Sequence, residues 1–476
     1  MEGDLELQTP AHFGNGDGDD LTDMPLLLDP CDEVEGKTTP LLTGASIAGA
    51  LRSYLRELEH GYKASEKAQS ASAQLFGAVK GDNDGEQSPL IIDDAFGENG
   101  AIEMRDGVKI DGKSRTAEDK KKFDLQLWQA GTKFTLRFEL LIRRVKDEAD
   151  EQQAYENSLK QSLATALNGF DNDGITLGAR KRRGYGRVKI KEWRIKTYAL
   201  TKQAELFDWL ENGNKKLPAS KKVTNLKVAL GVASFLEDYR KIFNLDATFS
   251  LDGSLLIRSG NNQDFSAPDM VHLHTNVDGS LKPVLSGTSL GGALRARGLK
   301  IANTIAKNDK KKSEDLINDV FGIEMKGDVQ PCASRVLIEE KVVEQPADAP
   351  QLVQNRVSID RFTGGARDTA LFNEQPVFGG DNTIVRVRLS LFDPACHEIG
   401  LLLLLLKDLW TSDLPLGGES SVGRGRLKGK DAKLTYRFDG KELRWIIKTN
   451  GEGLDVEGDK TVLESYVSTL QTHLGA

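Results

Sequence analysis

Cysteine is scarce in this sequence, and its few cysteines are too far apart in the chain to suggest a shared metal. Cys31, Cys332 and Cys396 are the three cysteines, and no two of them form a C-x-x-C pair. This usage suits a reducing cytosol and argues against a zinc site. The acidic N-terminus also lacks an apolar signal region. We therefore expect a cytoplasmic protein.

Long apolar runs and an excess of positive charge are missing as well. The most apolar run, Leu401–Leu406, is far too short to span a bilayer and predicts a buried helix. We therefore expect no membrane partner. The chain has 64 basic and 72 acidic residues, a formal charge of −8. This balance gives no global basic signature for nucleic acid, although the charge is unevenly placed along the chain.

What the sequence does contain is an internal repeat. The segment Pro40–Arg52, PLLTGASIAGALR, returns 243 positions later as Pro283–Arg295, PVLSGTSLGGALR, with most residues identical and no gap. Each copy predicts a turn that runs into a helix. Its glycines would let another backbone approach the first turn, which favours a tight helix–sheet contact. A helix start beside a nearby arginine can also bind a phosphate, and the recurrence of Arg52 and Arg295 in register beside Ser46 and Ser289 favours that role for them.

Other blocks recur in the same order at similar spacing. They are Asp23-Met24 and Asp269-Met270, Phe76-Gly77 and Phe321-Gly322, the alternating strands at 134–142 and 385–391, and the glycine-rich loops at 178–187 and 417–426. Each half therefore reads strand, helix, strand, polar excursion, strand, helix, loop, strand. This β-α-β-β-α-β order predicts an α+β fold of two tandem ferredoxin-like, RNA-recognition-type domains. We expect domains at 1–212 and 225–476 with a linker at 213–224, and a clipped first strand near Leu5–Leu7.

These blocks together resemble the backbone subunits of type III CRISPR–Cas effector complexes, in the RAMP superfamily. The resemblance covers nearly all of both halves, and two such domains on one chain are similar to the tandem fusions of type III-D systems. It implies a palm with a thumb hairpin in each domain, and a role in coating a crRNA guide and cutting complementary target RNA. The partners it implies are the guide, the target, neighbouring backbone subunits and the large polymerase–cyclase subunit. Because the first strand of the first domain is clipped, a neighbouring subunit would have to cover its sheet edge.

Two aspartates are the candidate catalytic residues. A carboxylate beside a scissile phosphate can hold a divalent metal or orient the 2′-hydroxyl that attacks it. The resemblance assigns this role to Asp23, with Mg²⁺ or Mn²⁺ as the cofactor held there, and to Asp269. Asp269 is followed by Met-Val rather than by the Met-Pro that follows Asp23, so its competence stays open. A turn-forming aspartate is the structural alternative at both positions.

Basic residues concentrate around the first glycine-rich loop. Nine basic residues stand between positions 178 and 196 against Glu192 alone. The loop lacks the Gly-Lys-Ser/Thr of a Walker motif, but backbone N–H groups beside dense charge can hold an RNA backbone without reading its sequence. A flexible surface hairpin is the alternative. The candidate RNA-binding residues are Ser46, Arg52, Ser289, Arg295, Arg180, Lys181, Arg182, Arg183, Tyr185, Arg187, Arg424 and Arg426 and, in the excursions, Lys109, Arg115 and Arg361.

Two further functions remain open on the sequence. The chain could be a purely structural RNA-binding subunit, in which case the aspartates have no catalytic role. It could also be a guide-processing endoribonuclease that uses His272 or His274, two histidines on one face of a predicted strand. Histidines in this arrangement are more often structural.

Overall fold

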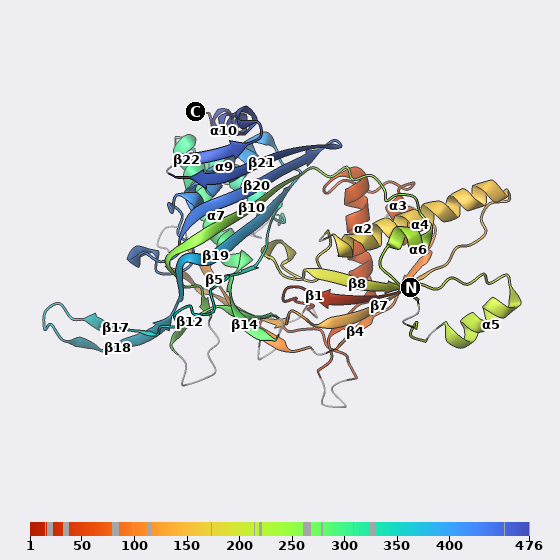
Figure 1. Cartoon of the computed structure of the whole chain (residues 1–476), viewed down its shortest axis with the longest axis horizontal. Coiled ribbons are helices and arrows are strands. Elements are labelled where there is room, and N and C mark those ends of the chain that lie inside the picture. The colour runs from red at the N-terminus through yellow and green to blue at the C-terminus, as the bar shows by residue number, and fades with distance from the viewer. Residues whose placement is uncertain are drawn as a thin grey trace.

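A computed structural model gives the fold of the chain. It describes residues 1–475 except for 15, 17–21, 32–37, 79–84, 99, 112–115, 173, 214, 219–220, 260–267, 278, 308, 324–329 and 452. Two domains lie side by side, each with helices packed on one face of an antiparallel sheet (Figure 1). Among the described residues, no helix is long and apolar enough to cross a membrane.

The first domain is organised around a short central strand. β1 (Glu2–Leu7) lies between β7 (Lys133–Leu140) and β8 (Val188–Arg194), and β3 (Leu90–Ile92) pairs with the other side of β7. The sheet edges carry β2 (Leu41–Leu42), β4 (Ala95–Glu98) and β9 (Lys222–Val223). The covering helices are α2 (Gly44–His60), α3 (Ala71–Phe76) and α4 (Ala149–Asp171). Alternate side chains of β7 point into the core, as the sequence pattern predicts.

The second domain repeats this plan with longer strands. β10 (Ile242–Leu255) lies between β19 (Val377–Phe392) and β20 (Arg426–Phe438), and β15 (Val336–Ile338) pairs with β19. The sheet continues through β21 (Lys441–Asn450) and β22 (Gly453–Glu457). Its helices are α7 (Gly287–Ile305), α8 (Lys310–Phe321), α9 (Cys396–Trp410) and α10 (Lys460–Leu474). Both sheets thus have the spatial order second, third, first, fourth strand, which confirms the predicted ferredoxin-like fold.

The leucine run Leu401–Leu406 lies in α9, and four of its six leucines are buried in the core of the second domain. This confirms the prediction of a buried helix. The run is apolar because α9 lies between the sheet and α10 and contacts both β20 and α10.

Each polar excursion forms a two-stranded hairpin, the predicted thumb. In the first domain β5 (Ile102–Ile110) pairs with β6 (Ala117–Trp128), and in the second β17 (Gln354–Ile359) pairs with β18 (Ala366–Gln375). The β17–β18 hairpin projects away from the body of the molecule (Figure 1). β11 (Arg258–Ser259) and β12 (Met270–His272) extend the sheet of this hairpin. A separate small sheet contains β13 (His274–Val277), β14 (Ser280–Leu285) and β16 (Lys341–Val342).

Two expectations about the chain's layout need correction. β1 has 6 residues against 14 in β10, but it is a central strand already paired on both sides, so its sheet edge needs no cover from a neighbouring subunit. Part of the predicted linker, 213–224, belongs to the first domain, because β9 pairs with β8. The short helix α6 (Leu226–Leu230) also packs on α4, with Leu226 in the first domain's core. The passage between domains therefore comes later than predicted.

One helix near this passage stands apart from the rest. α5 (Gln203–Asn212) extends to the right in Figure 1, and none of the described residues within it is buried. Its apolar side chains have no facing layer among the residues that the structure describes. Phe207 and Leu210 are exposed.

The contact between the domains contains a buried ion pair. Arg105 on β5 donates to both carboxylate oxygens of Glu340, at 2.6 and 3.0 Å, and both side chains are buried. Burial opposes the charge of Arg105, but the Glu340 carboxylate outweighs this effect and raises the pKa of Arg105. Nearby, Arg187 pairs with Glu339 at 2.6 Å. These pairs fix the first domain's thumb base and glycine-rich loop against the second domain.

Replacing Glu340 with alanine should destabilise the protein strongly. The change removes the two-bond partner of the buried Arg105 guanidinium and leaves it only the contact with Glu103 at 2.5 Å. Breaking a buried ion pair typically costs about 3–5 kcal/mol of unfolding free energy. Urea unfolding monitored by circular dichroism measures this loss. The double variant Arg105→Met/Glu340→Leu should recover part of this loss, because it removes both charges of the pair and leaves Glu103 with its hydrogen bond from Thr275. A Glu340→Ala protein as stable as wild type would contradict the assignment of this pair to a closed interface.

Candidate nucleic-acid interface

The two glycine-rich loops have the same backbone. In the first, η1 (Lys181–Arg183) lies between left-handed residues Arg180 (φ 53°) and Gly184 (φ 91°). In the second, η3 (Ser420–Val422) lies between Glu419 (φ 59°) and Gly423 (φ 90°). Left-handed conformations favour glycine, which explains the shared glycine spacing. The turn is therefore built twice, although only the first copy is rich in basic residues.

The first loop docks on the helix start of the second domain. A Cβ added to Gly287, at the beginning of α7, would lie 2.3 Å from the carbonyl oxygen of Arg183. A Cβ on Gly184 would lie 2.3 Å from the backbone nitrogen of Glu340. Only glycine permits these approaches, which confirms that the small residues admit another backbone at this turn. In the first domain the equivalent Gly44 faces Ile92 of its own sheet instead.

Four consecutive cations of the first loop, Arg180 to Arg183, form no ion pair among the described residues, although the nearby Glu57 carboxylate favours the charged form of Lys181. Arg180 lies over the Phe123 ring at 4.3 Å, and Arg182 lies over Phe392 at 4.1 Å. Burial lowers the pKa of Arg180, Lys181 and Arg183, and the neighbouring charge of Arg295 lowers that of Arg183 further. Arg183 Nη1 is buried without a hydrogen-bond acceptor. A partly buried cluster of like charges is costly, and a bound anion would relieve that cost.

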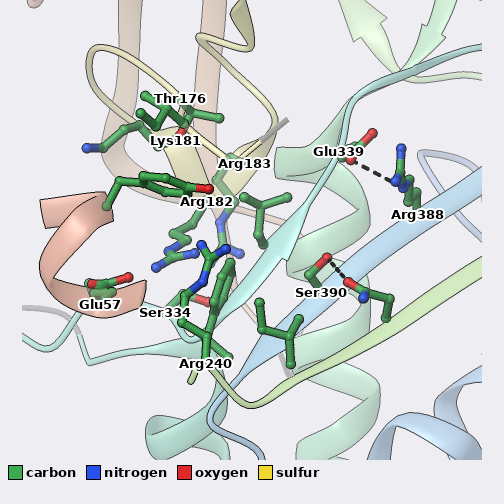
Figure 2. Close-up of a pocket in the computed structure, with 18 of the residues that line it drawn as sticks. Glu57, Thr176, Lys181, Arg182, Arg183, Arg240, Ser334, Glu339, Arg388 and Ser390 are labelled. Atoms are coloured by element: carbon green, nitrogen blue, oxygen red, sulfur yellow. Dashed lines mark hydrogen bonds and ion pairs between the residues drawn. The ribbon is translucent and has the colours of Figure 1, made fainter. Parts of the chain in front are cut away.

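These cations line a cleft between the domains with a volume of about 970 Å³. Figure 2 shows Arg182, Arg183 and Arg240 gathered together, with Arg388 and Ser390 across from them. The opposite wall is the open face of the second domain's sheet. Its basic residues are Arg388 on β19 and Lys433 and Arg437 on β20. The cleft is lined by nine basic residues and four acidic ones, so its net charge is positive.

The sequence prediction missed the wall residues Arg388, Lys433 and Arg437. Some of them have acidic neighbours, since Arg388 lies 3.5 Å from Glu339 and Arg437 lies 2.8 Å from Asp238. The alternation of side chains along β19 could have predicted that Arg388 faces away from the core, because Val387 and Leu389 on either side of it are buried. That signal alone does not say which outward face meets the first domain.

Several predicted RNA-binding residues have structural partners instead. Tyr185 is buried against Leu125 and Leu127 of β6, and Arg187 pairs with Glu339. Arg424, the counterpart of Tyr185, is buried in an ion cluster with Glu374 and Glu419. The glycine-rich loop is thus joined to the thumb in both domains, by the apolar contact of Tyr185 in the first and by the ion pair of Arg424 with Glu374 in the second. These placements explain the three residues without RNA, and Tyr185 and Arg424 are too buried to be the first contacts of a phosphate.

The helix-start residues also have local roles. The side chains of Thr43 and Ser286 cap α2 and α7 by accepting the N–H of Ser46 and Ser289 at 3.3 Å. Arg52 donates to the carbonyls of Gly77 and Ala78 at 3.1 and 3.0 Å. Arg295 donates to the Gly322 carbonyl at 2.8 Å. In both domains the arginine binds backbone carbonyls just beyond the end of the following helix, and this contact explains why the arginine recurs. Contact of these arginines with phosphate stays a prediction.

The remaining predicted contacts lie on loops and hairpins. Arg426 and Arg361 are exposed, the latter near the turn of the second thumb. Lys109 pairs with Glu118 across the first thumb at 3.4 Å. Arg115 lies outside the described residues. The structure does not gather Arg426, Arg361 and Lys109 with the cleft, and the role of all four residues stays a prediction.

Asp23 and Asp269 are exposed and occupy equivalent places beside the two thumbs. Asp23 exchanges backbone–side-chain hydrogen bonds with Asp124 on β6, and Asp269 does so with Asn373 on β18. No group of three or more potential metal ligands occurs among the residues that the structure describes. A metal at Asp23 would therefore need further ligands from RNA or water, as is usual for Mg²⁺.

His272 is unsuited to acid–base chemistry. Its ring is buried, the Ile257 N–H donates to Nδ1 at 3.1 Å, and Nε2 lies 3.0 Å from the Val284 carbonyl. Burial lowers the pKa of His272 to about 4. His274 is only partly buried, with Nδ1 at 2.6 Å from the His272 carbonyl. The pair holds β12 and β14 together, which supports the structural interpretation.

His272 should stay neutral well below neutral pH. Because its folded pKa is below the unfolded value, its contribution to stability is present above about pH 6.5 and is lost as pH falls toward 4. The lost contribution amounts to about 3 kcal/mol for the full shift. Following the ring C–H resonances by NMR against pH measures this directly. A His272 signal that titrates near pH 6.5 would contradict the buried placement.

Comparison with known proteins agrees with the repeat. The model of the RAMP superfamily matches residues 4–189 and, a second time, residues 248–428. The two matches cover both glycine-rich loops, both thumbs and both candidate aspartates. None of the curated proteins compared with the chain matches it.

Proposed function

The chain belongs to the RAMP superfamily of CRISPR-associated RNA-binding proteins, and from this membership we propose that it coats a crRNA guide as a backbone subunit of a type III effector complex and cuts the complementary target RNA. The observation that carries the proposal is the run of cations Arg180–Arg183, which lines the interdomain cleft and forms no ion pair in the described part of the chain. A phosphate backbone is the anion that such a run fits.

Guide binding of this kind is independent of sequence. Arginine and lysine side chains contact phosphates, which are alike in every guide, and they leave the bases free to pair with a target. The cleft has basic residues on both walls, with the loop on one side and Arg388 and Lys433 on the other. An RNA strand that passes between the domains would therefore be held by both domains at once.

Cleavage is assigned to Asp23 and, where competent, Asp269. In the proposed reaction the 2′-oxygen of the target attacks phosphorus, the bond to the 5′-oxygen breaks, and a proton passes from the 2′-hydroxyl to the leaving oxygen. The carboxylate orients the 2′-hydroxyl or receives its proton. A divalent metal held by Asp23 would supply charge stabilisation at the phosphate. The exposed position of both aspartates beside the thumbs leaves room for a substrate backbone.

A second candidate, a purely structural subunit, is favoured by one observation. Both aspartates already accept a hydrogen bond from a thumb strand, so their recurrence has an explanation without catalysis. The guide-processing alternative loses support because His272 is buried with both ring nitrogens engaged.

The identity of the RNA that co-purifies with the chain tests guide binding. The chain is expressed with its neighbouring effector subunits, the complex is purified, and the bound RNA is sequenced. We expect transcripts of the CRISPR array, with constant repeat-derived parts and variable spacers. Recovery of unrelated cellular RNA, or of none, would contradict a guide-coating role.

A further inference from the structure

The loop that carries each candidate catalytic aspartate is tied to its thumb by a reciprocal pair of hydrogen bonds. In the first domain the Asp23 N–H donates to Asp124 Oδ1 at 2.8 Å, and the Asp124 N–H donates to Asp23 Oδ2 at 3.1 Å. In the second, the Asp269 N–H donates to Asn373 Oδ1 at 2.6 Å, and the Asn373 N–H donates to Asp269 Oδ2 at 2.9 Å. The same atoms make the same two bonds in each domain.

The partner residues occupy corresponding positions of the repeat. Asp124 and Asn373 are 249 positions apart, the same offset that relates Val108 and Val357 in the facing strands of the two thumbs. Asp124 lies on β6 and Asn373 on β18. The connection is therefore a property of the repeated unit and not a chance contact of one loop.

Further contacts secure the first loop along β6. Thr22 Oγ1 donates to Asp124 Oδ1 at 2.8 Å. The Gln126 N–H donates to the Met24 carbonyl at 3.2 Å, and the Leu26 N–H donates to Gln126 Oε1 at 3.1 Å. Hydrogen bonds on both sides of Asp23 thus hold this loop against the hairpin, so that the exposed aspartate and the thumb keep a fixed relation.

The geometry explains what the partner side chain must supply. The side chain at position 124 or 373 has to supply one acceptor oxygen, the Oδ1 that both Asp and Asn carry. The other hydrogen bond of the pair comes from the backbone N–H of the same residue and does not depend on its side chain. Charge is not required, since Asn373 is neutral and makes the same bonds as Asp124. Without this acceptor the backbone N–H of the catalytic aspartate is no longer tied to the thumb, so the aspartate loop can shift. Misplacing a reacting group by about 1 Å can cost a hundredfold in rate.

We propose that Asp124 and Asn373 are positioning residues, which hold Asp23 and Asp269 in register with the RNA seated on each thumb. The inference rests on the proposed function, because it assumes that these aspartates act on the target. It assigns the geometry of cleavage to the thumb as well as to the aspartate loop. Each site needs a side-chain acceptor oxygen, which Asp124 supplies in the first domain and Asn373 in the second.

The test measures single-turnover cleavage at each cut, together with target affinity, in assembled complex. Asp124→Ala should slow the cut that depends on Asp23 by tenfold or more, leave the target Kd unchanged, and leave the other cut at its wild-type rate. Asp124→Asn should restore the rate, because the acceptor oxygen returns. Asn373→Ala should slow the Asp269 cut in the same way, and Asn373→Asp should preserve it.

A matched control lies on the facing strand of the same hairpin. Asp106 is the cross-strand neighbour of Asp124 and pairs with Lys122, so Asp106→Ala removes an equal charge without touching the aspartate loop and should leave the cut unchanged. Wild-type cleavage by Asp124→Ala, or an Asp124→Asn protein as slow as Asp124→Ala, would overturn the inference while leaving cleavage by Asp23 standing. Survival of every wild-type cut in Asp23→Ala would instead overturn the cleavage proposed for Asp23 itself.

Discussion

Replacing Asp23 with alanine should abolish one cut in the target RNA while the complex assembles and binds target as before. Asp23 is exposed, and its carboxylate makes no ion pair with the residues that the structure describes, so its loss removes little binding energy. Removing a group that takes part in proton transfer typically slows a reaction by a factor of about 10²–10⁴. Incubating a labelled complementary RNA with assembled complex and resolving the products to single nucleotides measures the effect.

Asp269→Ala and metal removal complete this experiment. Asp269→Ala should remove a second, displaced cut if the second domain is competent, and chelating divalent metal should mimic the Asp23 change. Asp29→Ala is the matched control, because Asp29 lies in the same loop region and accepts a hydrogen bond from the Cys31 N–H. Survival of every wild-type band in the Asp23/Asp269 double variant would make the chain a scaffold.

Neutralising the first glycine-rich loop should weaken guide binding about a hundredfold. Three phosphate contacts from Lys181, Arg182 and Arg183 contribute roughly that factor at about 0.15 M salt, and their loss should flatten the log–log salt dependence by about one per contact. The triple alanine variant should lose affinity equally for guides of any sequence. Binding titrations over a series of salt concentrations measure both quantities.

The control for this variant is a run of three basic residues elsewhere in the chain. Lys310, Lys311 and Lys312 are exposed on α8, so their replacement by alanine makes the same charge change away from the cleft. Affinity and salt dependence should then stay at wild-type values. Equal effects from both triple variants would mean that net charge alone, and not the cleft, governs RNA binding. Unchanged binding in the loop variant would remove the loop from the RNA path.

The repeat made most of the fold predictable. Strand alternation in β7 and the order of elements in each half are local features, and both domains have the predicted strand order. The burial of the α9 leucines was also predictable, because an apolar run too short to span a bilayer is expected to lie in a protein core. The domain boundary was not predictable, since the pairing of β9 with β8 and the packing of Leu226 are tertiary contacts with no local signature.

The candidate site was predictable only in part. Sequence identified the basic loop and the recurring aspartates, because each is a contiguous pattern. It could not show that Arg52 binds the end of α3 or that Tyr185 and Arg424 occupy one position with different partners. Recurrence marks a residue as important to the repeated unit, but a structural requirement recurs as faithfully as a functional one.

The cleft itself was invisible in the sequence. Arg183 and Arg388 are distant in the chain, and they come together only because the first loop docks on the start of α7. The partner of Asp23 was closer to being found. Extending the 249-position offset from Val108 along the thumb reaches Asp124 and Asn373, although the hydrogen bonds require the structure.

The most direct test of the account is to locate the guide on the chain by cross-linking. Assembled complex carrying a guide with 4-thiouridine is irradiated, digested and analysed by mass spectrometry. We expect cross-linked peptides that contain the loop at 180–183 and, from the opposite wall, the β19 and β20 segments around Arg388 and Lys433. Cross-links confined to the helical faces around α9 and α10, with neither cleft wall labelled, would contradict this expectation.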